Sequence, residues 1–130
     1  MERTRDVIGL IAALMIIVSS GAHTILGWRG MRGELAVARV PGDLMLGLQI
    51  GWQFGGAAML TFGVVLFAIF RQRLRGANGS LLLPRAVALT YLLFGAWALA
   101  ATGGDLFFLV FLIPGAFLAV ASMYRLQPSN

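Results

Sequence analysis

The run from Leu44 to Phe70 constrains this chain more than any other stretch, because its 27 residues carry no charged side chain. A helix needs about 20 apolar residues to cross the hydrocarbon core of a bilayer. A charge-free run of this length therefore predicts a membrane-spanning helix and argues against a water-soluble domain.

Three further apolar runs follow the same pattern, and short polar connections with turn residues separate them. Of all residues, 59% are hydrophobic and 12% are charged, about half the charged fraction of a soluble domain. We predict an all-α integral membrane protein, a four-helix bundle of antiparallel up-down spans in one transmembrane domain, residues 1–130. The predicted spans cover residues 7–28, 44–70, 81–102 and 106–124. The connection over residues 29–43 is expected to contain a short interfacial helix, Met31 to Val40.

All ten basic residues are arginines, and the formal net charge is +5. Four spans place seven arginines on the side of the two termini and three on the opposite side. Because arginines concentrate in cytoplasmic loops, this predicts cytoplasmic N- and C-termini. The seven are Arg3, Arg5, Arg71, Arg73, Arg75, Arg85 and Arg125; the three are Arg29, Arg32 and Arg39. The basic charge is thus explained without a nucleic-acid partner, since no basic patch is interleaved with aromatics outside the spans.

Polar side chains inside the spans form the candidate site. Helical rise places His23 of the first span at a depth similar to that of Gln49 and Gln53 of the second, with Trp52 beside them. Three interpretations remain open. The groups hydrogen-bond to one another and fasten two helices, with about 0.6 to 2 kcal/mol for each contact, or they bind a ligand, ion or cofactor. In the third, the spans are rotated and the groups do not meet. Thr102 and Asp105 are expected near the same boundary, where Asp105 also suits a helix N-cap. Trp52 and Trp97 are candidates to close the pocket.

Three glycines recur at every fourth position of the second span, at Gly47, Gly51 and Gly55. This spacing forms a stripe along one side of a helix and lets another helix approach closely. We predict a helix-docking surface, used either within the chain or to bind a second copy or another membrane subunit.

Catalytic chemistry has little support. The predicted spans contain no carboxylate for acid–base work. One histidine without cysteine does not complete a zinc site from a single chain, so no metal site is predicted. The chain also lacks nucleophile-elbow, phosphate-loop and dinucleotide motifs. Axial ligation of haem or chlorophyll by His23 stays an alternative; otherwise no cofactor is expected.

The segment HTILGWRGMRGEL, with WQFGGAAML in the following span, resembles a family of small uncharacterised bacterial four-span membrane proteins. The matching positions are His23, Leu26, Gly27, Arg29 and, less closely, Leu35. The resemblance covers the first half of the chain and implies a bacterial inner-membrane location and no activity. The family's commoner polar residues in the second span appear here as Gln49 and Gln53.

Together these features predict a non-enzymatic subunit or accessory protein of a membrane complex. Two alternatives remain: a small transporter or channel that uses the polar residues, and a pigment- or haem-binding subunit.

Overall fold

The computed structural model describes residues 2–123, and this part of the chain is helical with no β-strand. Its elements are α1 (Glu2–Ala22), the π-helical segment η1 (His23–Gly27), α2 (Trp28–Val37), α3 (Gly42–Leu74), α4 (Leu82–Ala101), the 3₁₀ turn η2 (Leu106–Phe108) and α5 (Leu109–Ser122).

Three helices are long and apolar enough to cross a bilayer. They are the continuous helix Glu2–Val37 of 36 residues, Gly42–Leu74 of 33 residues and Leu82–Ala101 of 20 residues. The all-α prediction is confirmed, and so are helices of membrane-spanning length. The predicted span 106–124 corresponds to the shorter apolar helix Leu106–Ser122, and its last residue, Tyr124, lies outside the described residues.

The first helix is longer than the predicted span. The sequence suggested a span ending at Trp28 and a separate interfacial helix, whereas η1 joins α1 and α2 without a break. The helix stops only at the turn before Pro41, where the Val40 N–H donates to the Leu35 carbonyl at 3.1 Å and Arg39 adopts a positive φ of 53°. Such a left-handed residue is a common helix ending, and the residue before a proline is disfavoured in a helix. Arg29 marks the end of the apolar run but not the end of the helix.

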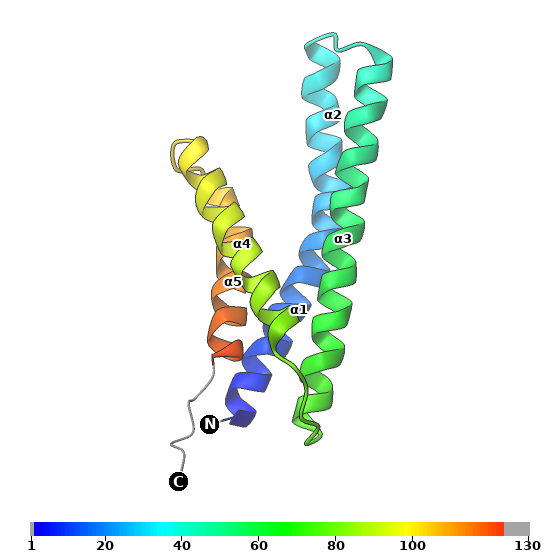
Figure 1. Ribbon diagram of the computed structural model, residues 1–130. Coiled ribbons are helices and arrows are strands. Elements are labelled where there is room, and N and C mark those ends of the chain that lie inside the picture. The colour runs from blue at the N-terminus through cyan, green and yellow to red at the C-terminus, as the bar shows by residue number, and fades with distance from the viewer. Residues whose placement is uncertain (1, 124–130) are drawn as a thin grey trace.

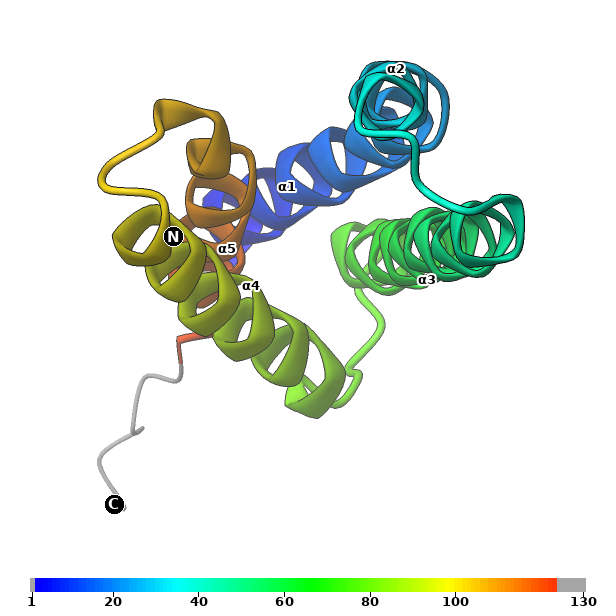
Figure 2. The same cartoon turned by 90° about the horizontal axis from the view of Figure 1, so that it is seen from above.

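The helices form two antiparallel hairpins (Figure 1). The first, α1–η1–α2 with α3, is much longer than the second, α4 with α5. In space α1 packs between α3 and α5, and α4 packs on α5. The hairpins converge at the end that carries the N-terminus and diverge toward the other end. From above, α3 and α4 lie close only near the connection that joins them and run apart from there (Figure 2). The arrangement is an open V of helices.

The core lies where the hairpins converge. Its fully buried side chains include Ile16 of α1, Leu66 and Phe70 of α3, and Leu118 of α5. Small residues let the backbones approach here: a Cβ built on Gly9 would overlap the ring of Phe70. Because lipid tails are as apolar as these side chains, close packing stabilises this contact more than water exclusion does.

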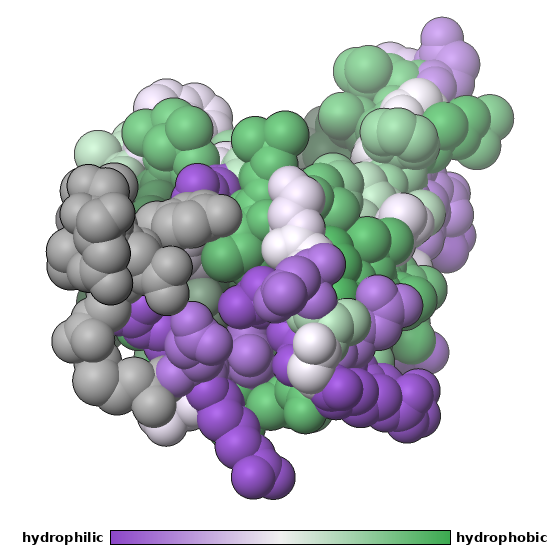
Figure 3. All heavy atoms as spheres, turned by 60° about the horizontal axis from the view of Figure 1, so that its bottom comes forward, coloured by the Kyte–Doolittle hydropathy of each residue, from purple (hydrophilic) through white to green (hydrophobic). Residues whose placement is uncertain are grey.

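Charged groups gather at the converging end, which we call the basic end (Figure 3). Arg73 Nε of α3 lies 2.7 Å from the buried Asp6 carboxylate of α1. Arg5 donates to the Met123 carbonyl at 3.0 Å, and Arg85 donates to the Ser122 carbonyl at 3.0 Å. These contacts tie the start of α1, the end of α3, the start of α4 and the end of α5 into one layer.

The long hairpin exceeds the thickness of a bilayer. At 1.5 Å per residue its two helices are about 54 Å and about 50 Å long, against about 30 Å of hydrocarbon. It extends well beyond the α4–α5 hairpin (Figure 1). The part that extends, which we call the projecting tip, comprises α2 and the start of α3, and it carries exposed charged residues such as Arg29, Arg32 and Glu34.

Candidate functional site

The candidate site is centred on η1, where the first helix changes from α to π geometry. A π segment moves backbone donors and acceptors out of the α-helical spacing, and such segments are frequent at functional sites. Here α3 supplies side-chain donors to η1. Trp52 Nε1 donates to the His23 carbonyl at 2.8 Å, and Gln53 Nε2 donates to the Thr24 carbonyl at 3.4 Å. Two neighbouring side chains of α3 thus bind two neighbouring carbonyls of η1.

His23 and Trp52 also pair through their rings. The centroids are 4.2 Å apart and the planes differ by 6°, so the rings are stacked. His23 Nε2 lies 3.3 Å from the Trp52 carbonyl oxygen. The pair therefore has a contact in each direction, from each side chain to the backbone of the other residue.

Glycines make room for this pairing. A Cβ on Gly27 would lie 2.8 Å from Trp52 Cζ2, and one on Gly55 would lie 3.4 Å from His23 Nε2. A Cβ on Gly56 would overlap the Thr24 hydroxyl. Glycine at Gly27 and Gly56 is favoured by close approach between the helices, and not by an unusual backbone angle, whereas a Cβ at Gly55 would make an ordinary contact. We call His23, Thr24, Trp52 and Gln53, together with these glycines, the η1 fastener.

The structure brings together three of the four predicted site residues: His23, Trp52 and Gln53. Gln49 lies one turn further toward the projecting tip, half-buried on the same side of α3 as Gln53. Among the described residues its side chain makes no hydrogen bond. The matched depth of His23 and Gln53 follows the prediction, but their link passes through the Thr24 carbonyl and the Trp52 backbone.

Two residues of this region were missed. Thr24 accepts from Gln53 through its carbonyl, and Trp28 is 6% exposed with a buried Nε1 that has no partner in the described part of the chain. Both lie within five residues of His23 in the sequence. That proximity was the available signal, but Trp28 was interpreted only as the end of the span.

The residues of the second hairpin that were expected near the same boundary make their contacts within their own hairpin. Trp97 is 65% exposed and packs against Phe94 of its own helix. The Thr102 hydroxyl donates to the Ala98 carbonyl within α4 at 2.8 Å. Asp105 accepts from the Phe107 N–H at 2.9 Å, which confirms its predicted N-cap role. They sit on the hairpin that diverges from α1 and α3 (Figures 1 and 2).

The glycine stripe divides into two parts. Gly55 faces His23, whereas a Cβ on Gly47 or Gly51 would meet nothing within 4 Å. Gly47 and Gly51 are exposed, and exposed Ile50 and Phe54 flank them. Of the three glycines in the stripe, only Gly55 lies in the contact between the two helices of the long hairpin.

The chemistry of the site is that of hydrogen bonding and stacking. Residues 2–123 contain no group of three or more His, Cys, Asp or Glu side chains arranged to hold a metal ion. His23 Nε2 faces the α3 backbone beside Gly55. A haem or chlorophyll metal at Nε2 would therefore require separation of α1 from α3.

Replacing Trp52 by phenylalanine tests the fastener. The ring stack on His23 is retained, but the hydrogen bond to the His23 carbonyl is lost, and the carbonyl stays in an apolar setting. We expect the free energy of unfolding in detergent micelles to fall by about 1 kcal/mol. Trp97→Phe is the matched control, expected to change stability by less than about 0.5 kcal/mol. Equal losses for the two variants would contradict the fastening role of Trp52.

Comparisons with protein-family models, with curated proteins and with solved structures match nothing. This agrees with the expectation that the resemblance noted above carries no function.

Proposed function

We propose that the chain is a non-enzymatic integral membrane subunit, which joins a larger membrane assembly through the open side of α3. The observation that carries this proposal is the open space beyond Gly47 and Gly51. The contact of α3 with η1 is already made on another side of the helix, by Trp52, Gln53 and Gly56. The two exposed glycines are therefore left for a helix from outside the chain, and exposed glycine at this spacing favours close helix packing in lipid.

We propose four spans, with α5 as the last and with both termini in the cytoplasm of a bacterial inner membrane. The support is the basic end, where Arg5, Arg73 and Arg85 bind groups on α1 and α5 in one layer. With an even number of crossings, the chain must end on the side where it began, and α5 ends in the same layer in which α1 begins. Arginines of the two chain ends and of the α3–α4 connection belong to the same side, which is the cytoplasmic side by the positive-inside rule.

Depth along the long hairpin fits this orientation. His23 follows Asp6 by 17 residues, which corresponds to about 25 Å of helix. With Asp6 at the cytoplasmic boundary, the η1 fastener lies near the outer boundary of about 30 Å of hydrocarbon. The charged residues of α2 then lie at and beyond this boundary, in keeping with their charge.

The assembly is tested with Gly51→Leu. A leucine there blocks close approach of a neighbouring helix, and its Cβ meets no atom of its own chain within 4 Å, so we expect the particle mass in mild detergent to fall to that of one chain. The unfolding free energy of the resulting monomer should stay within about 1 kcal/mol of that of dissociated wild type. Ala57→Leu, another exposed small-to-large change on α3, is the control and should keep the wild-type mass.

If the wild-type protein and Gly51→Leu had the same particle mass and co-purified with the same proteins, docking through this side of α3 would be contradicted. A lower mass for both leucine variants would also contradict it, because the effect would then not depend on the stripe.

A further inference from the structure

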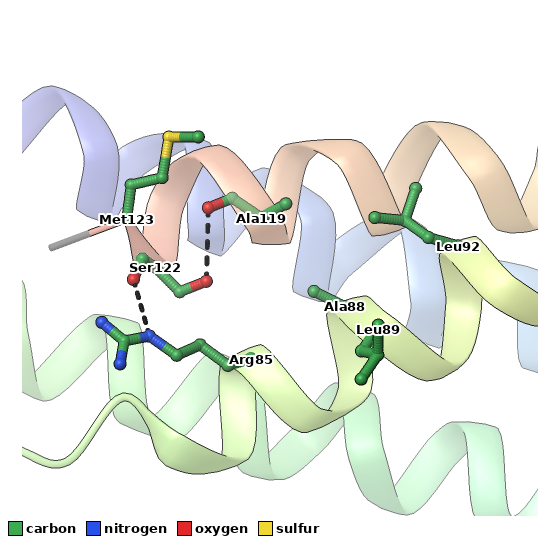
Figure 4. Close-up of a pocket in the computed structure, with 7 residues that line it drawn as sticks. All are labelled: Arg85, Ala88, Leu89, Leu92, Ala119, Ser122 and Met123. Carbon is green, nitrogen blue, oxygen red and sulfur yellow. Dashed lines mark hydrogen bonds between the residues drawn. The ribbon is translucent and has the colours of Figure 1, made fainter.

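A groove at the basic end lies between α4 and α5, away from the η1 fastener (Figure 4). Its volume is about 330 Å³, at the lower end of the range for small-molecule sites, about 300 to 1,000 Å³. The groove is shallow and open along one side rather than enclosed. In a bilayer the molecules that reach such a surface first are lipids.

The lining divides into a polar end and an apolar length. Arg85 and Ser122 lie at one end, next to Met123 (Figure 4). Ala88, Leu89 and Leu92 of α4 and Ala119 of α5 continue from there toward the interior of the membrane-spanning segment. A cationic end followed by an apolar channel matches an amphiphile with an anionic head and a hydrocarbon chain.

The guanidinium at the polar end is held in position. Arg85 Nε donates to the Ser122 carbonyl at 3.0 Å, and the Ser122 hydroxyl donates back to the Leu118 carbonyl at 2.6 Å. Arg5 donates to the neighbouring Met123 carbonyl at 3.0 Å, which brings a second positive charge to the same end of α5. Arginine presents five N–H donors in a fixed fork, suited to phosphate oxygens.

The depth of Arg85 fits a lipid headgroup. It lies in the first turns of α4, in the same layer as the Asp6–Arg73 pair. An arginine at a helix end keeps its charge at the membrane interface while its stem lies along apolar surface. Anionic lipids are concentrated in the cytoplasmic leaflet, and their negative charge attracts arginine side chains there.

We infer that this groove binds one anionic glycerophospholipid, with the phosphate at Arg85 and an acyl chain along Ala88, Leu89 and Leu92. The phosphate is drawn by charge complementarity with Arg85 and Arg5, and the acyl chain replaces bulk lipid against the apolar lining. This site is independent of the docking side of α3, so the two proposals can fail separately.

The test is a titration of the purified full-length chain, in detergent, with phosphatidylglycerol and with phosphatidylcholine of the same acyl length, read as lipid adducts by native mass spectrometry. We expect one adduct of phosphatidylglycerol at an affinity about fivefold above that for phosphatidylcholine. The same lipid should raise the thermal midpoint of the wild type more than phosphatidylcholine does. These two measurements on the wild type do not depend on whether any variant folds.

Variants then locate the site. Arg85→Gln should reduce the preference for phosphatidylglycerol about fivefold, whereas Arg85→Lys should retain most of it. Arg71→Gln is the control. Arg71 is an exposed arginine in the last turn of α3, at the basic end, and it is not part of the groove lining. Glycerol phosphate without acyl chains should not compete.

Three results would overturn the inference: equal affinity of the wild type for the two lipids, equal losses for Arg85→Gln and Arg71→Gln, or full competition by glycerol phosphate. The first would mean that the groove has no anionic occupant, for example because residues of this chain fill it. The second would indicate unspecific attraction by surface charge, and the third a site for free phosphate.

Discussion

Gly63→Leu is expected to lower the free energy of unfolding by about 3 kcal/mol, one of the two largest effects of a single substitution that the structure predicts. A Cβ at Gly63 would lie 2.6 Å from Ile17 Cγ1, 3.1 Å from the Ile17 nitrogen and 3.2 Å from the Ala13 carbonyl oxygen. Rotation of the Ile17 side chain relieves only the first of these contacts, because the other two atoms are backbone. α3 would have to move away from α1, which would disturb the core at Leu66.

The measurement is equilibrium unfolding in detergent micelles, followed by circular dichroism. Gly21→Leu is the matched control on the facing helix, since a Cβ there meets nothing within 4 Å and leucine favours the helical state more than glycine does. We expect the control to be as stable as wild type or slightly more stable. If both variants lost the same stability, the close α1–α3 contact at Gly63 would be wrong.

Asp6→Ala is expected to cost a similar amount, about 3 kcal/mol, because it leaves the Arg73 guanidinium without its carboxylate. The side chains are 7% exposed for Asp6 and 19% exposed for Arg73, and Arg73 Nε lies 2.7 Å from Asp6 Oδ1. Removing one partner from a buried pair costs about 3 to 5 kcal/mol, and the partial exposure of Arg73 favours the lower end of that range.

A double-mutant cycle separates the pair from its surroundings. Asp6→Ala with Arg73→Gln should be more stable than the sum of the single changes predicts, by at least about 1 kcal/mol. Glu2→Ala, an exposed acidic residue of the same helix, is the control and should change stability by less than about 0.5 kcal/mol. Additive single effects would show that the two side chains do not stabilise each other.

The first helix carries a pattern that sequence alone makes readable. Small or polar residues such as Gly9, Ala12 and Ser20 are buried, whereas the branched side chains of Ile11 and Val18 are exposed. Small and polar residues mark helix contacts in membranes, whether or not the partner helix is known. The depth of His23 relative to Gln53 followed from helical rise alone.

The π-helical segment η1 could not be predicted from helical periodicity. A wheel of constant 3.6-residue period assumes α geometry throughout, but η1 inserts a wider turn at His23–Gly27. Its carbonyls are bound by Trp52 and Gln53, which are 29 residues away along the chain. A local pattern does not contain that information, so the continuous helix and the role of Thr24 were missed.

The divergence of the two hairpins was missed for a different reason. Trp97 and Phe94 of α4 were compatible with a closed bundle. Lipid and protein interior are similarly apolar, so hydropathy does not show which of the two an apolar side chain faces. In the structure α4 packs on α5 and diverges from α3, and Trp97 is exposed. Which apolar faces meet is decided by the detailed fit of close-packed side chains, and not by hydropathy.

The proposed topology is tested most directly by labelling single cysteines in intact cells with a maleimide that does not cross membranes. The chain has no cysteine of its own, so each introduced thiol reports one position. We predict that Ala38→Cys and Thr102→Cys react from outside, whereas Gly79→Cys reacts only after the membrane is opened. Reaction of all three from outside, or protection of Thr102→Cys together with Gly79→Cys, would contradict four crossings with the basic end in the cytoplasm.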